Sequence, residues 1–173
     1  MEALDTVQNY IQRHGLIRRG DTVLLAVSGG IDSVAMADLL VRLREKLGFQ
    51  PVIATFNHQL RPEAAEEAVF VHTLADRYGV PFYEGSADIA ALAKGKNLED
   101  TARRERYGFL FSVAYKLGAV SVATAHHRDD QAETLLLHLL RGSGPAGLAG
   151  MAPSKNRVIR PLLPLTREDI TAY

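Results

Sequence analysis

Cysteine is absent from this 173-residue sequence, and so is any apolar run long enough to cross a membrane. Without cysteine the chain can have no disulfide bridge, thiolate zinc site, cysteine nucleophile or cysteine-bound iron–sulfur cluster. The N-terminal residues also lack the basic-then-apolar layout of a signal peptide. We therefore expect a cytoplasmic protein without a membrane partner.

An excess of charge is missing as well. Twenty basic and twenty acidic residues give a formal net charge of zero, so the composition does not indicate a general binder of polyanions. Five basic and only two acidic residues follow position 140, which is weak support for a local RNA-binding face. The chain has no internal repeat or low-complexity tract, and its apolar content of 47% is enough for a buried core. One domain over residues 1–173 is expected.

One short stretch carries the strongest local signal. Residues 22–27 (TVLLAV) are apolar on both faces, which is typical of a buried strand in a parallel sheet. Residues 28–33 (SGGIDS) follow at once, and their two glycines allow a sharp turn and a close approach to a ligand. Asp32 and Ser33 open a predicted helix over residues 34–47, whose first turn presents free N–H groups. A strand, a glycine turn and a helix start together predict an anion-binding site, most often for phosphate.

The common phosphate motifs do not match this stretch. No lysine follows the glycines as a Walker loop requires, and the spacing of a dinucleotide-binding loop also fails. An ordinary turn with a helix cap would explain serine, glycine and aspartate here. The strand before the turn and the helix after it favour the phosphate interpretation.

Strand-like and helix-like segments alternate along the rest of the chain. Strands are expected over residues 51–58, 80–83, 119–125 and 157–163. Helices are expected over 4–17, 62–78 and 97–117, through 135–140 with a start near the carboxylates at 129–133, and from about 166. This order predicts an α/β fold: a doubly wound, Rossmann-like parallel sheet of about five strands with helices on both faces. Residues 142–151 are rich in glycine and predict a mobile loop, either a linker or a lid over the ligand.

Polar residues gather where the predicted strands end, which is where such sheets bind ligands. His58 and Arg61 follow the second strand, although a solvated histidine and a surface arginine would explain them. Glu99, Arg103 and Arg106 share one face of the helix over 97–117, where a charged, solvated face is the simpler interpretation.

The segment after the fourth strand, residues 126–134 (HHRDDQAET), is harder to explain by capping alone. Asp129, Asp130 and Glu133 cluster at a helix start, where the dipole stabilises carboxylates. They can bind Mg²⁺ with water molecules or accept a substrate ammonium group. Transition-metal binding by His126, His127 and Asp130 is a third option, disfavoured because neighbouring residues rarely face one site.

Residues 28–33 resemble the loop S-G-G-x-D-S of the PP-loop ATP pyrophosphatases at all five fixed positions. Those enzymes cleave ATP between its α- and β-phosphates and adenylate a carbonyl-type oxygen. Later segments are similar to the tRNA(Ile)-lysidine synthetases of that superfamily: residues 57–64, 102–107, 125–134, 140–144, 147–151 and 160–163. The related tRNA thiolases depend on cysteine, which is missing here. The family continues into C-terminal tRNA-binding domains that these residues do not include.

The resemblance implies an adenine nucleotide α-hydrolase-like fold and a two-step ligation. ATP adenylates the C2 oxygen of the wobble cytidine in a tRNA(Ile) with a CAU anticodon, and pyrophosphate leaves. The ε-amine of free L-lysine then attacks C2, and AMP departs to leave lysidine. The implied ligands are ATP, Mg²⁺, L-lysine and this tRNA, and the family suggests a homodimer. The alternatives are an amidating synthetase such as an NAD synthetase, or an ATP-binding module without turnover.

The resemblance also implies roles for single residues. We expect the catalytic residues to be Asp32, Arg106, His126 and Asp130, with Asp32 also holding Mg²⁺. Lysine is expected to bind Asp130 and Glu133. The expected ATP-binding residues are Ser28, Gly29, Gly30, Ile31, Asp32, Ser33, Arg141 and Gly142.

Overall fold

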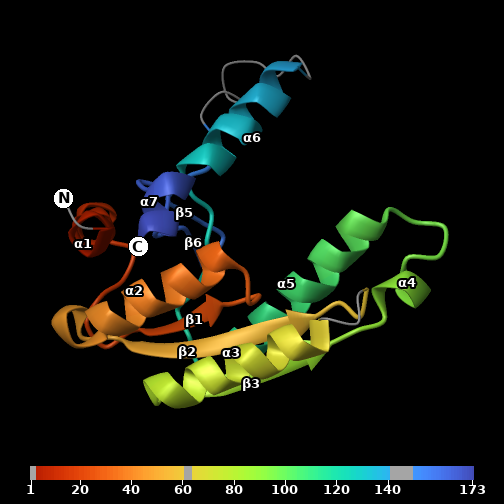
Figure 1. Ribbon diagram of the computed structural model, residues 1–173, viewed down its shortest axis with the longest axis horizontal. Helices are drawn as coiled ribbons and strands as arrows, with labels where there is room; N and C mark the ends of the chain where they lie inside the picture. The colour runs from red at the N-terminus through yellow and green to blue at the C-terminus, as the bar shows by residue number, and fades with distance from the viewer. Residues whose placement is uncertain (1–2, 61–63, 141–149) are drawn as a thin grey trace.

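The computed structural model describes residues 3–60, 64–140 and 150–173, and it has a mostly parallel sheet at its centre. Six strands lie in the order β3-β2-β1-β4-β6-β5, and only the β5–β6 pair is antiparallel. The strands are β1 (Thr22–Ala26), β2 (Gln50–Asn57), β3 (Phe82–Ser86), β4 (Ser121–Ala123), β5 (Ser154–Lys155) and β6 (Val158–Ile159). The predicted doubly wound α/β architecture is confirmed (Figure 1).

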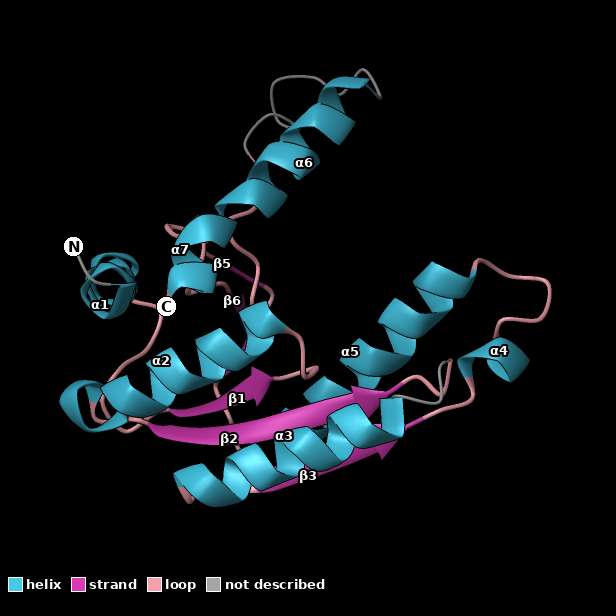
Figure 2. Ribbon diagram, viewed as in Figure 1, coloured by secondary structure: helices cyan, strands magenta, loops and turns pink. Residues whose placement is uncertain are grey.

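Helices cover both faces of the sheet (Figure 2). The described helices are α1 (Ala3–His14), α2 (Ile31–Leu47), α3 (Ala64–Tyr78), α4 (Ile89–Leu92), α5 (Leu98–Lys116), α6 (Arg128–Leu140) and α7 (Arg167–Ala172). Apolar residues of α1, α2, α3 and α7 form one core cluster with the sheet, and α5 forms a second cluster against the opposite face. None of these helices, within the described residues, is long and apolar enough to cross a membrane.

Strand β1 is buried on both faces of the sheet. Val23, Leu24 and Leu25 are all fully buried, because Val23 and Leu25 pack toward α2 while Leu24 packs toward α5. The continuous apolar run that predicted a buried parallel strand therefore serves two cores, one on each side.

Helix α6 differs from the others. It projects away from the sheet (Figure 1), and none of its residues is buried. Four leucines near its end are exposed, namely Leu136, Leu137, Leu139 and Leu140. Its first turn, which contains Asp129 and Asp130, is joined to neighbouring segments of the fold by hydrogen bonds.

Several predicted boundaries are wrong, each for a local reason. The third strand is Phe82–Ser86 rather than residues 80–83, because the chain turns at Gly79 with a φ of +62° before pairing. The fourth strand shortens to three residues. The strand predicted over 157–163 shortens to β6, and the unpredicted strand β5 pairs with it in a hairpin, giving six strands instead of about five. Asn156 and Arg157 both have positive φ, as a tight hairpin turn requires, and Pro161 lacks the N–H that would extend β6.

The strand order places the loops after β1 and β4 at the centre of one sheet edge. The chain builds outward from β1 through β2 to β3, then crosses to the opposite side of β1 to form β4. The connections from these two neighbouring strands therefore diverge, which opens a crevice between them. Residues 28–33 and 124–130 meet at that crevice.

Candidate active site

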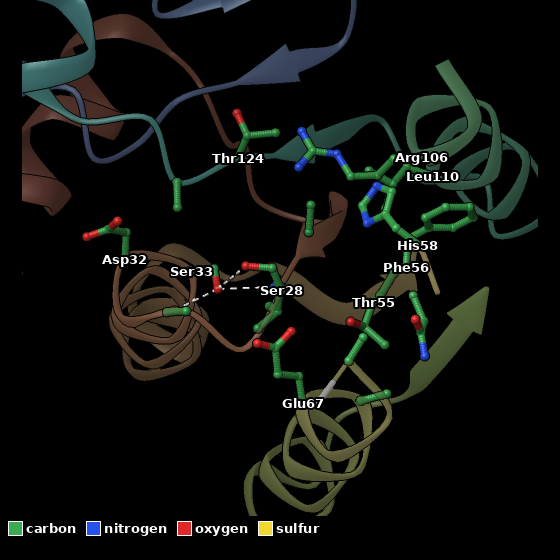
Figure 3. Close-up of a pocket in the computed structure, with 18 of the residues that line it drawn as sticks. Ser28, Asp32, Ser33, Thr55, Phe56, His58, Glu67, Arg106, Leu110 and Thr124 are labelled. Carbon is green, nitrogen blue, oxygen red and sulfur yellow. Dashed lines mark hydrogen bonds between the residues drawn. The ribbon is translucent and has the colours of Figure 1, made fainter. Parts of the chain in front are cut away.

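A cavity of about 440 Å³ lies at the carboxyl ends of β1, β2 and β4 (Figure 3). Its wall combines the turn after β1, the start of α2, the end of β2, α3, α5, the segment after β4 and the first residue of α7. Its polar lining residues are Ser28, Asp32, Ser33, Thr55, Asn57, His58, Glu67, Arg106, Thr124, His126, His127, Asp130 and Arg167.

The turn after β1 is held by hydrogen bonds within its own six residues. Ser33 Oγ donates to the Gly30 carbonyl at 2.8 Å and accepts from the Ser28 amide at 3.1 Å. The hydroxyl of Ser28 lies 3.2 Å from the same oxygen, as the dashed lines in Figure 3 show. Gly30 caps α2 without any side-chain hydrogen bond, so the first N–H groups of the helix remain available to an anion.

Two features of the structure require glycine at position 29: the backbone conformation there and the close approach of Glu67. Its φ is +90°, which residues with a side chain rarely adopt, and an added Cβ would lie 3.3 Å from Cβ of Glu67 on α3. Gly29 therefore lets the turn lie directly against α3.

Asp32 presents its carboxylate to the cavity from the first turn of α2. Its Oδ2 lies 3.2 Å from Nη1 of Arg167, while Oδ1 is buried without a hydrogen-bond partner among the described residues. An unpaired carboxylate oxygen beside phosphate-binding amides fits Mg²⁺, which takes one or two carboxylates and completes its shell with phosphate and water. No cluster of three or more histidine, aspartate or glutamate side chains in residues 3–60, 64–140 and 150–173 is arranged to hold a metal ion.

His127 joins the two loops of the crevice. Its ring is only 5% exposed, and Nε2 lies 3.6 Å from Asp130 Oδ2 and 3.9 Å from Asp32 Oδ2. Its backbone amide donates to Asp130 at 2.8 Å, and Asp129 in turn accepts from the Arg167 amide at 2.6 Å. This chain of contacts fixes Asp130 in the cavity wall beside Asp32.

His126 lies near a different group of charged side chains, which includes three arginines. Its Nδ1 lies 2.9 Å from Thr124 Oγ1, whose hydroxyl donates to the Ile159 carbonyl at 3.4 Å. In that arrangement Nδ1 carries the proton and Nε2 keeps a free lone pair. Burial, reinforced by the positive charges of Arg160, Arg106 and Arg103, lowers the pKa of His126 below its ordinary value, although Asp130 opposes the shift. The ring is thus neutral at pH 7 and can accept a proton.

Arg106 lies across the cavity from the serine turn. Figure 3 shows its guanidinium next to His58, on the side away from Asp32. Burial and this arginine lower the pKa of His58, while a contact with the Ala102 backbone raises it. The cavity thus has one end around Ser28 and Ser33, which we call the phosphate-binding end after the anion site predicted there, and a cationic end around Arg106.

The comparison with known proteins gives the family. A family model described as a PP-loop domain matches residues 3–173. The chain belongs to the PP-loop family.

This PP-loop domain also has curated relatives over nearly its whole length. It is 47% identical to a tRNA(Ile)-lysidine synthase from Geobacter sulfurreducens over 98% of the chain and 37% of that protein. It is 48% identical to a tRNA(Ile)-lysidine synthase from Thermus thermophilus over 88% of the chain and 29% of that protein. The chain therefore spans about a third of the length of these relatives.

Solved structures share the fold of the PP-loop domain at low identity. A U34-tRNA thiolase from Methanococcus maripaludis, with a [4Fe-4S] cluster, superposes with a TM-score of 0.77 at 16% identity, covering 97% of this chain and 60% of that one. An NH3-dependent NAD synthetase from Campylobacter jejuni gives a TM-score of 0.61 at 18% identity, with coverage of 97% and 68%. These likenesses confirm the predicted Rossmann-like fold class.

The PP-loop domain brings most of the predicted site residues to one cavity. These are Ser28, Gly30, Asp32, Ser33, Arg106, His126 and Asp130. Gly29 and Ile31 do not line the cavity, and Glu133 is exposed on α6 outside its wall. Arg61, Arg141, Gly142 and most of the predicted loop over 142–151 lie outside the described residues, so those expectations stay predictions.

Two of the lining residues, His127 and Arg167, lie beside Asp32 and were not among the predicted catalytic or ligand-binding residues. His127 stands in the same motif as His126, but no sequence pattern distinguishes which ring is buried between the carboxylates. Arg167 reaches Asp32 only because α7 begins beside the first turn of α6, where the Arg128 amide donates to the Leu165 carbonyl at 2.8 Å. No signal near position 167 in the sequence could have indicated that contact.

Proposed function

We propose that this PP-loop domain catalyses the ATP-dependent ligation of L-lysine to C2 of the wobble cytidine in a CAU-anticodon tRNA(Ile). The proposal rests on one juxtaposition: a phosphate-binding turn and the carboxylate of Asp130 face the same cavity, in a chain 40–48% identical to proteins named tRNA(Ile)-lysidine synthase. ATP, Mg²⁺, L-lysine and the tRNA are its proposed ligands. We place it in the cytoplasm as a homodimer.

The turn after β1 binds the leaving group in this scheme. When the cytidine O2 attacks the α-phosphorus of ATP, the bond to the β-phosphate breaks and negative charge develops on pyrophosphate. The uncapped amides of α2 and the hydroxyl of Ser28 stabilise that charge from the cavity wall, while Ser33 holds the turn in place through its hydrogen bond to the Gly30 carbonyl. Asp32 would hold Mg²⁺, which supplies further charge stabilisation at the phosphates.

The segment after β4 binds the nucleophile. L-Lysine arrives with a protonated ε-amine, which the Asp130 carboxylate attracts. After the ammonium loses one proton to solvent, the amine lone pair attacks C2, the C2–O bond to AMP breaks, and the neutral ring of His126 accepts the proton that the nitrogen releases as the C2–N bond forms. Arg106 contacts the cytidine or the adenylate phosphate, and Glu133 adds a second acidic group outside the cavity wall. Arg141 and Gly142 remain proposed contacts of the α-phosphate.

The amidating and non-catalytic alternatives have weaker support. The NAD synthetase neighbour shares the fold at 18% identity, whereas the lysidine synthase relatives are more than twice as similar. A thiolase reaction through a cysteine-bound cluster is unavailable to a chain without cysteine.

The test incubates the complete gene product, and residues 1–173 alone, with labelled L-lysine, ATP and an isoleucine tRNA carrying CAU. Lysine should enter the RNA with one AMP released for each lysine, and a transcript with uridine at the wobble position should take up none. Release of AMP that depends on deamido-NAD instead of tRNA would support the amidating alternative and contradict the proposal.

A further inference from the structure

Three arginines from distant parts of the chain lie at the cationic end of the cavity. Arg103 and Arg106 come from α5, where Arg106 is one turn before the buried Leu110. Arg160 directly follows β6 in the sequence. We call Arg103, Arg106 and Arg160 the arginine cluster.

Sheet register brings Arg160 to the side of the sheet that α5 covers. Ile159 pairs with Ala123 of β4 and packs into the core cluster on the α2 side. Because successive strand residues face opposite sides, Arg160 faces α5. Its position is level with Thr124, whose amide donates to the Ile159 carbonyl at 3.0 Å. Arg160 therefore lies next to the segment that carries His126.

An aromatic ring holds two members of the cluster together. The guanidinium carbons of Arg103 and Arg106 lie 5.3 and 5.2 Å from the ring centre of Tyr107. Tyr107 itself stacks on Phe111 one turn later, with ring centres 5.9 Å apart. The ring thus orients two like charges toward one region instead of letting them separate into solvent.

The arginine cluster has no counter-ion among the described residues. None of its members forms an ion pair with a described carboxylate, whereas their neighbour Arg104 pairs with Glu105 at 3.0 Å. The Nε atoms of Arg106 and Arg160 are both buried without a hydrogen-bond partner. Burial, with the nearby charge of Arg103, also lowers the pKa of Arg160. Arg103 is exposed and Arg160 Nη1 donates to the Ala152 carbonyl at 2.8 Å, but the two buried Nε groups without a partner are unfavourable unless an anion joins them.

We propose that the arginine cluster binds a phosphodiester of the RNA strand next to the nucleotide that reacts in the cavity, with Arg103 and Arg160 holding that phosphate and Arg106 reaching from it to the reacting nucleotide. This rests on the proposed function, which supplies RNA as the substrate. The phosphates of ATP already have a binding turn around Ser28 and Ser33, on the other side of the cavity from Arg106 (Figure 3). Residues 1–173 carry zero net charge and have no general attraction for RNA, so within them a local cluster of basic side chains is the feature suited to bind it. Guanidinium forks match phosphate oxygens, and the contact orients the strand without reading its sequence.

The experiment measures binding of a labelled RNA stem-loop with a CAU anticodon to the wild-type protein at several salt concentrations. R103Q and R160Q should each weaken binding about tenfold and reduce the slope of log affinity against log salt by about one. R104Q is the matched control, because Arg104 is on the same helix but already paired, and it should change neither quantity. R160K should keep the slope while losing part of the affinity, since the charge stays and the fork is lost.

ATP binding is measured on the same variants by calorimetry, because the α-phosphate is another source of phosphate. The affinity of R103Q and R160Q for ATP should stay within about twofold of wild type. Weaker ATP binding with unchanged RNA binding would assign the arginine cluster to the nucleotide and overturn the proposal. Wild-type protein that binds no RNA at low salt would overturn it too, and so would an R104Q effect equal to that of R160Q.

A second RNA separates this proposal from the proposed function. The affinity losses should be the same for a stem-loop with another anticodon, because a phosphodiester contact is independent of base identity. If no lysine is incorporated but these affinity losses are found, the proposed ligation is contradicted and RNA binding by the arginine cluster is supported. If lysine is incorporated but R103Q and R160Q lose no RNA affinity, RNA binding by the arginine cluster is contradicted and the proposed ligation is supported.

Discussion

The two ends of the cavity are built in different ways. The phosphate-binding end is one contiguous stretch whose hydrogen bonds join Ser28, Gly30 and Ser33 to one another. The cationic end needs α5, β4 and β6 to pack before Arg106, His126 and Arg160 come near each other. The first end is encoded locally and the second only by the fold, which is why a motif can identify one and not the other.

The two ends also differ in how their charges are balanced. Asp32 is paired with Arg167 and lies beside the buried His127, so the phosphate-binding end is internally compensated before ligand arrives. The arginine cluster has no such compensation among the described residues. The difference predicts that loss of Asp32 abolishes chemistry, while loss of a charge from the arginine cluster changes the binding of substrate and the titration of the nearby histidines.

The largest effect is expected from Asp32→Ala. Loss of the carboxylate removes the proposed Mg²⁺ ligand and leaves Arg167 unpaired beside the phosphates, so AMP formation should fall about 10³-fold or more. Asp38→Asn is a matched control, since Asp38 is also a half-buried carboxylate on α2 but bonds Tyr78 and Tyr173 outside the cavity. AMP release assayed with tRNA and lysine checks both. An Asp32→Ala protein within tenfold of wild type would contradict the assignment.

A smaller and more selective effect is expected from Asp130→Asn. Removing a charge that binds the lysine ammonium should raise the KM for lysine about 10- to 100-fold and leave the KM for ATP within about twofold. Glu133→Gln should have less effect, because Glu133 is exposed and outside the cavity wall. Steady-state kinetics with each substrate varied in turn distinguishes them. A larger change in the KM for ATP than for lysine would reverse the assigned role of Asp130.

The sequence predicted the part of this site that depends on short-range order. The α/β class, the turn over 28–33 and the convergence of Asp32 with Asp130 all follow from strand–helix alternation, because neighbouring parallel strands end at one edge. Sequence reasoning failed where tertiary packing decides. The hairpin β5–β6 depends on positive φ at Asn156 and Arg157, and arginine is not a residue that indicates such a turn.

The same limit explains the residues of the site that were missed. Nothing in the pair His126–His127 shows that the second ring is buried between Asp32 and Asp130 while the first faces the arginines. The contact of Arg167 with Asp32 depends on how α7 packs beside α2 and α6. Helix α6 shows the same limit for burial. Its sequence pattern predicts a helix, but does not predict that its leucines are exposed to solvent and do not pack on the sheet.

Gly29→Ala tests whether the locally encoded end depends on its backbone geometry. A side chain at a φ of +90° and 3.3 Å from Glu67 should cost about 1–2 kcal/mol of stability and weaken ATP binding about tenfold. Gly118→Ala provides the control, since Gly118 has a φ of +63° with nothing near its absent Cβ and lies outside the cavity. The thermal unfolding temperature should fall in both variants. The affinity for ATP, measured by calorimetry, should fall only in Gly29→Ala. Equal ATP affinity in both would show that the turn tolerates the strain.

The smallest effect concerns titration at the cationic end. Arg106 lowers the pKa of both His58 and His126, although burial is the larger cause in each. Arg106→Gln should therefore raise both pKa values, and Arg104→Gln should change neither; NMR titration of the imidazole signals measures this. Below pH 6.5 the unfolded chain binds more protons at these histidines than the folded one, so the free energy of unfolding decreases as pH falls toward the lowered folded pKa values. Arg106→Gln narrows that pH window because it brings the folded pKa values closer to the unfolded ones. An unchanged window would mean that Arg106 contributes nothing to these pKa values and that its charge is not coupled to the two histidines.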